Sequence, residues 1–114
     1  MIDQAAIADI VSLYKKHGWA LRRFLATPEL IKVLTEQSDL WQGIEHRSSD
    51  INGAWFSRSS NPENETWELR LLTPTPFALL EVLSKSATET EREEALTRVE
   101  EKMREFRATQ PRSH

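Results

Sequence analysis

The chain has 114 residues, of which 39% are hydrophobic and 29% are charged, and its formal net charge is -3. This size and composition are ordinary for one soluble globular domain, and the acidic balance disfavours nucleic acid, because domains that bind a phosphate backbone generally carry a basic stripe. No cysteine is present, which excludes disulfides, thiol nucleophiles and thiolate metal sites.

The location of the protein is suggested by two further features of the sequence. No apolar run approaches the roughly 18 to 20 residues of a membrane span, and the first ten residues, MIDQAAIADI, lack the basic start and cleavage site of a signal peptide. We therefore expect a cytoplasmic protein without a membrane partner. A single α+β domain is expected over residues 1–108, followed by a flexible tail over 109–114.

A first helix is predicted between Asp3, a suitable N-cap, and Gly18, which can take the left-handed conformation that ends a helix. His17 lies in the last turn, where positive charge complements the helix dipole, so we interpret it as a structural residue rather than a ligand or base. The apolar spacing of three and four residues is typical of one buried face and is formed by Ile7, Ile10, Val11 and Tyr14.

Residues 19–25 are predicted to form a strand, which leads into a second helix. Thr27 can cap this helix, Pro28 suits its first position because the missing N–H costs nothing there, and Glu29 lies near the positive end of the dipole. Its apolar side would consist of Leu30, Ile31, Val33 and Leu34.

The segment 38–53 is the least regular part of the sequence. Ser38 could cap one short turn that carries Leu40 and Trp41. We expect a strand over about 51–58 with a bulge or bend at Gly53, and an additional edge strand near 44–49 is the alternative.

A β-hairpin and two helices are predicted in the remainder of the chain. The polar segment 59–65 separates the strand-like runs AWFSR and TWELRLL, which indicates an antiparallel hairpin. Thr75-Pro76 resembles the cap of the second helix and predicts a third helix that carries Phe77, Leu79, Leu80, Val82 and Leu83.

The last helix is expected to begin with a capping box formed by Thr88 and Glu91. Its apolar stripe would consist of Leu96, Val99, Met103 and Phe106, while Glu94/Arg98 and Glu100/Arg104 would face water as pairs four residues apart.

Two stretches of the chain resemble each other at an offset of 48 residues. In GWALRRFLATPEL and TWELRLLTPTPFA, the counterparts of Trp19, Leu21, Arg22, Thr27 and Pro28 are Trp67, Leu69, Arg70, Thr75 and Pro76. A true duplication would give two strand-helix units with a shared core around both tryptophans, whereas capping physics alone can also produce the match.

The predicted fold is α+β, with an antiparallel sheet of three to four strands, helices mainly on one face, and the order helix-strand-helix-strand-strand-helix-helix. Arginine and aromatic residues are enriched at interfaces, so the other face is a candidate binding surface. It would carry Arg22, Phe24, Phe56, Arg58 and Arg70. Alternatively, the N-terminal or C-terminal helix covers this face and the arginines pair with carboxylates.

No catalytic residues, cofactor site or metal site are predicted. The only dense polar cluster is Glu45 to Asp50, and His46 has no second well-placed imidazole with which to complete a site. The leading hypothesis is therefore a non-catalytic protein-interaction module that binds a protein partner or self-associates, for example as a homodimer through the sheet and the last helix. The alternative is a small-molecule binder or enzyme with a pocket near residues 38–50.

Overall fold

Three helices and five strands make up the part of the chain that the computed structural model describes, which is residues 3–35, 39–73 and 77–109. The α+β class predicted from the sequence is confirmed, whereas the predicted number of strands and the order of the elements are wrong in detail. The elements are α1 (Gln4–Lys16), β1 (Ala20–Ala26), α2 (Pro28–Leu34), β2 (Glu45–Ser48), β3 (Gly53–Ser59), β4 (Asn64–Leu71), β5 (Phe77–Ser84) and α3 (Glu89–Thr109).

The sheet is mixed rather than antiparallel throughout. Its strands lie in the order β2-β1-β3-β4-β5, so β2 and β5 form the two edges. β1 and β2 are parallel, and α2 lies in the connection between them, whereas each of the other neighbouring pairs is antiparallel. β3 and β4 form the predicted antiparallel hairpin, and the polar segment after β3 is its turn.

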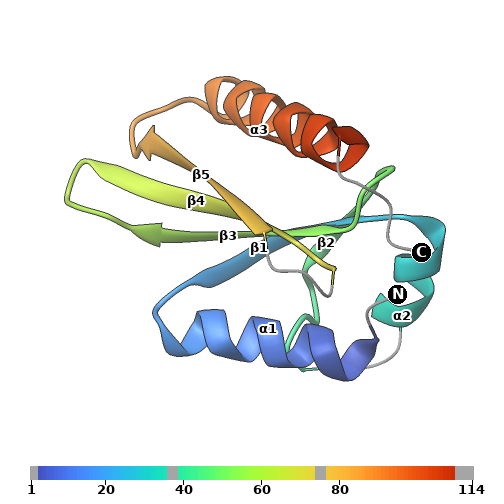
Figure 1. Cartoon of the computed structure of the whole chain (residues 1–114). Coiled ribbons are helices and arrows are strands. Elements are labelled where there is room, and N and C mark those ends of the chain that lie inside the picture. The colour runs from blue at the N-terminus through green and yellow to red at the C-terminus, as the bar shows by residue number, and fades with distance from the viewer. Residues whose placement is uncertain (1–2, 36–38, 74–76, 110–114) are drawn as a thin grey trace.

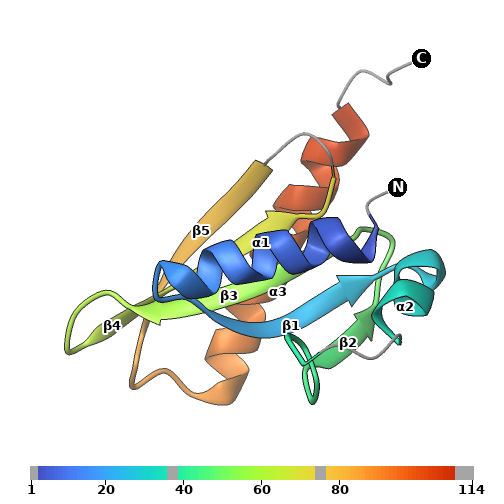
Figure 2. The same ribbon diagram turned by 90° about the horizontal axis from the view of Figure 1, so that it is seen from below.

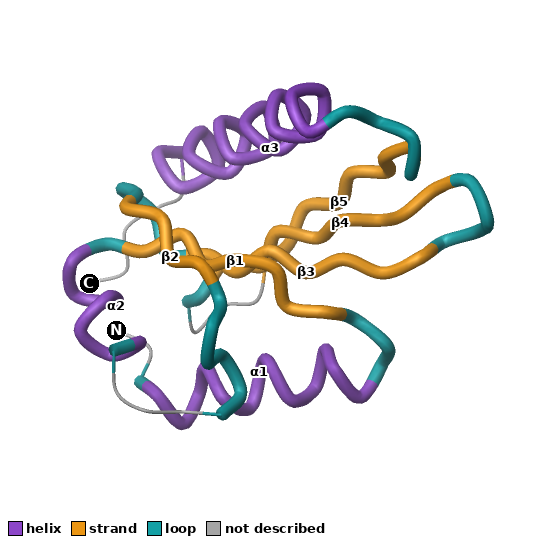
Figure 3. Tube along the Cα trace, turned by 180° about the vertical axis from the view of Figure 1, so that it is seen from behind, coloured by secondary structure: helices purple, strands orange, loops and turns teal. Residues whose placement is uncertain are grey.

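Helices cover both faces of the sheet, which corrects the expectation of helices mainly on one face. Figures 1 and 3 show α3 on one side of the strands and α1 on the other. The physical reason lies in the central strands, where consecutive residues are buried on opposite sides. Phe56 belongs to an apolar cluster with residues of α1 and α2, and Trp55 belongs to a second cluster with residues of α3.

The capping signals in the sequence are confirmed at all three helix starts. The carboxylate of Asp3 accepts a hydrogen bond from the N–H of Ala6 at 2.9 Å, and the Thr27 hydroxyl accepts one from the N–H of Leu30 at 3.4 Å. Thr88 and Glu91 form the reciprocal capping box, with N–H to oxygen distances of 2.9 and 3.1 Å.

The helix predicted for residues 77–83 is wrong, because this segment is strand β5. Phe77, Leu79 and Leu83 share one parity of the strand and contribute to the cluster under α3. A short run that is apolar at nearly every position fits a strand as well as a helix, so its periodicity does not distinguish the two. The predicted cap at Thr75-Pro76 lies outside the described residues, as do Ser38 and residues 110–114 of the tail predicted over 109–114. The first residue of that predicted tail, Thr109, is the last residue of α3.

The segment 44–53 contains the edge strand that was the alternative interpretation of the sequence. This strand is β2, and the following strand is regularly paired at Gly53, opposite Leu25 and Leu71. The predicted bulge at Gly53 is therefore wrong. A register shift occurs in β1 instead, between Leu21 and Arg23.

The repeated stretches do not form two equivalent units. The first copy is a strand followed by helix α2, whereas the second is strand β4 followed by strand β5. Trp19 packs against the cluster under α1, and Trp67 is buried in the cluster under α3. The two tryptophans therefore do not share a core as the duplication hypothesis required.

Candidate interaction surface

The irregularity in β1 splits the predicted binding surface between the two faces of the sheet. Leu21 pairs with Phe56 and Arg23 pairs with Trp55, so Arg22 is the extra residue of a bulge. The guanidinium of Arg22 lies 4.9 Å from the ring centre of Trp67, on the α3 side. Arg22 is thus on the opposite side from Phe24, with which the sequence pattern had grouped it.

Helix α1 covers the middle of the predicted surface. Phe24 and Phe56 are both 0% exposed in the cluster beneath α1, so neither ring can contact a partner in this structure. Arg58 stacks on Trp19 with 4.8 Å between the guanidinium and the ring centre, and it donates a hydrogen bond to the carbonyl of His17. Arg70 is half-buried and donates to the carbonyl of Leu71. The five residues therefore do not form one open surface.

The uncovered part of this face lies on β5. Figure 2 shows that α1 crosses the sheet over the middle strands and leaves β5 beyond the helix. Leu80 and Val82, whose parity on β5 points to the α1 side, are 60% and 61% exposed and are the two most exposed large hydrophobic residues of the described chain. Together with Ala78 and the outer backbone of the strand they form what we call the β5 surface.

The alternation of hydrogen-bonded pairs between β4 and β5 shows which backbone N–H and C=O groups of β5 face the open edge of the sheet. The N–H of Lys85 donates to the carbonyl of Glu63 at 2.9 Å, immediately beyond the end of the β4-β5 pairing. Because hydrogen-bonded positions alternate along an antiparallel pair, the odd-numbered residues of β5 face β4. Ala78, Leu80 and Val82 consequently direct their N–H and C=O groups toward the open edge.

A polar contact marks the boundary between α1 and β4. The Tyr14 hydroxyl donates a hydrogen bond to Oε2 of Glu68, and the Tyr14 ring stacks on Phe56 with the ring centres 4.0 Å apart. Burial, together with the neighbouring Glu68 carboxylate, raises the pKa of Tyr14 above its usual range. The phenol is therefore held as a neutral donor, which suits a role in attaching α1 to the sheet.

The opposite end of the molecule carries a network of ion pairs. Arg23 holds Glu93 through two parallel hydrogen bonds of 2.9 and 3.0 Å and also contacts Glu45 at 3.1 Å. The hydrogen bonds from Arg23 keep the pKa of Glu93 below its usual range. Arg47 adds contacts of 2.9 Å to Glu93 and 3.2 Å to Glu45, so these charges satisfy one another.

Glu100 and Arg104 of α3, which were predicted to pair with each other, contact residues of other elements instead. Glu100 accepts a hydrogen bond from the indole N–H of Trp55 at 2.9 Å, and Nε of Arg104 lies 2.6 Å from the carboxylate of Asp50. These residues therefore attach α3 to the sheet and to the loop after β2 rather than pairing with each other in water.

The polar cluster near residues 38–50 does not converge on one point. Glu45 reaches Arg23 on the α3 side of β2, whereas His46 lies with its ring centre 6.1 Å from that of Phe24, which belongs to the cluster under α1. Asp50 is held by Arg104. Within residues 3–35, 39–73 and 77–109, no group of three histidine, aspartate or glutamate side chains is placed to hold a metal ion.

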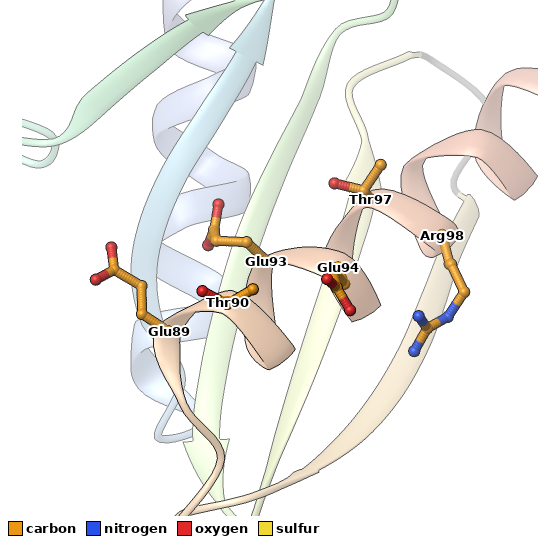
Figure 4. A pocket seen from close by; sticks show the side chains of 6 residues that line it. All are labelled: Glu89, Thr90, Glu93, Glu94, Thr97 and Arg98. Carbon is orange, nitrogen blue, oxygen red and sulfur yellow. The ribbon is translucent and has the colours of Figure 1, made fainter.

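A shallow, open depression lies along α3. Figure 4 shows the six side chains that line it, all from this one helix: Glu89, Thr90, Glu93, Glu94, Thr97 and Arg98. Glu93 extends toward the β1 side of the helix and Arg98 toward the side where β5 lies. Because the depression is open and is formed by a single helix, it does not enclose a small molecule in the way that ligand pockets usually do.

Comparison with protein families, curated proteins and solved structures found no match for this chain. In the described part of the chain, no helix combines the length and the apolar character needed to cross a membrane.

The β5 surface was not found from the sequence, although part of its signal is present. Leu80 and Val82 were recognised as apolar residues of one segment, but the segment was predicted to be a helix. Alternation becomes visible only once the segment is read as a strand, because Phe77, Leu79 and Leu83 then share the buried side. The exposure of Leu80 and Val82 also depends on where α1 packs on the sheet, which the sequence of the β5 segment does not show.

Proposed function

We propose that this chain is a non-catalytic protein-interaction module that binds a protein strand at the outer edge of β5. The observation that carries the proposal is the combination of exposed Leu80 and Val82 with outward-facing backbone groups on the same residues. Addition of a strand would pair the backbone groups and would cover part of the aliphatic side chains. The absence of cysteine also favours our expectation that the protein acts in the cytoplasm.

Of the features that usually prevent such pairing, β5 has one charged residue, Glu81, and lacks short length, lysine and proline. Natural edge strands are commonly short, or carry lysine or proline. β5 has eight residues, and neither lysine nor proline occurs among them. Its one charged residue, Glu81, has the parity of the α3 side and so does not interrupt the row of Ala78, Leu80 and Val82.

The pocket hypothesis for residues 38–50 has less support. Enzymes and small-molecule binders place several polar groups around one reacting or bound atom. In this chain Glu45 and Asp50 are paired with arginines, and His46 points to the other side of the sheet from Glu45. A binding module does not need such convergence.

The proposal can be tested with a photoreactive amino acid at position 82, used in the purified protein and in an extract of the source cells. We expect adducts in at least one of these preparations, and we expect Leu80→Lys to abolish them because a charge would be placed on the docking surface. The matched control carries the photoreactive residue at Glu101, which is exposed on α3. Absence of adducts from position 82 in both preparations, or equal adducts from position 101, would show that the proposed function is wrong.

A further inference from the structure

We draw no further inference here: the strongest candidate, the open outer edge of β5 with the exposed side chains of Leu80 and Val82, belongs to the site already described, and nothing in the structure shows which strand covers it.

Discussion

Replacing neighbouring residues of β5 by proline should give opposite results, because the N–H groups of consecutive strand residues point in opposite directions. Because hydrogen-bonded positions alternate along the β4-β5 pair, the N–H of Glu81 points to β4, opposite Trp67, and the N–H of Val82 points to the open edge. Proline removes the N–H and adds a ring at that position. Glu81→Pro therefore acts on the fold, whereas Val82→Pro acts on whatever binds at the edge.

The magnitudes follow from the groups that lose a partner. In Glu81→Pro, one ladder hydrogen bond is lost, at a net cost of about 0.5–1.5 kcal/mol, and the carbonyl of Trp67 in the buried middle of β4 is left without its donor, which adds about 1–3 kcal/mol. Val82→Pro removes a donor that faces the edge, at a side chain that is 61% exposed. We expect it to change the free energy of unfolding by less than about 1 kcal/mol.

Urea unfolding followed by tryptophan fluorescence measures this difference. With an m-value of about 2 kcal/mol/M, a loss of about 2–4 kcal/mol lowers the midpoint by about 1–2 M in Glu81→Pro. The chain should be dilute enough that the wild-type midpoint does not depend on concentration, so that dimerisation does not contribute. Equal destabilisation by the two variants would refute the assigned phase of β5, and with it the outward direction of the Leu80 and Val82 backbone groups.

Three further predictions concern contacts that hold the helices to the sheet. Arg23→Ala should lower the free energy of unfolding by about 2–3 kcal/mol, because the Arg23 side chain is only 11% exposed and holds Glu93 through two hydrogen bonds. Arg47→Ala should lower it by less than about 1 kcal/mol, because the Arg47 side chain is 44% exposed. Equal losses for the two variants in urea unfolding would contradict this difference between the two arginines. The pKa of Glu93 is lower in the folded state than in the unfolded state, so the stabilisation from its ionised carboxylate is present above the unfolded pKa and is lost as the pH falls through the folded pKa. Between about pH 5 and pH 3, the urea unfolding midpoint should therefore fall less steeply with pH in Glu93→Gln than in the wild type. The same dependence of the midpoint on pH in both proteins would contradict this linkage. Tyr14→Phe keeps the aromatic stack but removes the hydrogen bond to Glu68, so thermal unfolding should show a loss of about 1 kcal/mol, and no loss would mean that the hydroxyl does not help to attach α1.

The parts of the fold that the sequence predicted well are those governed by local physical chemistry. Asp3, Thr27 and the Thr88-Glu91 pair cap helices through hydrogen bonds to backbone groups within three residues, so the relevant signal lies within one turn. The hairpin between β3 and β4 was predicted for the same reason, because its turn residues lie together in the sequence.

The parts that were predicted wrongly depend on contacts between distant segments. Residues 77–83 became a strand because β4 offers eight residues of antiparallel pairing and α3 offers an apolar cover, neither of which is visible in the segment itself. The bulge at Arg22 likewise reflects the register between β1 and β3. It separates Arg22 from Phe24, while α1 covers Phe24 and Phe56, and together these two features break up the predicted binding surface.

The two edges of the sheet differ in a way that supports β5 as the site of strand addition. β2 has only four residues, and three of them, Glu45, His46 and Arg47, carry charged or imidazole side chains. Glu45 and Arg47 are also engaged with Arg23 and Glu93. Short length and charge are the features by which natural sheets prevent edge-to-edge pairing. Both edges belong to the same molecule and are subject to the same need to avoid aggregation. The aliphatic row on β5 is therefore best explained by a specific strand that covers it, rather than by a general tolerance of open edges in this fold.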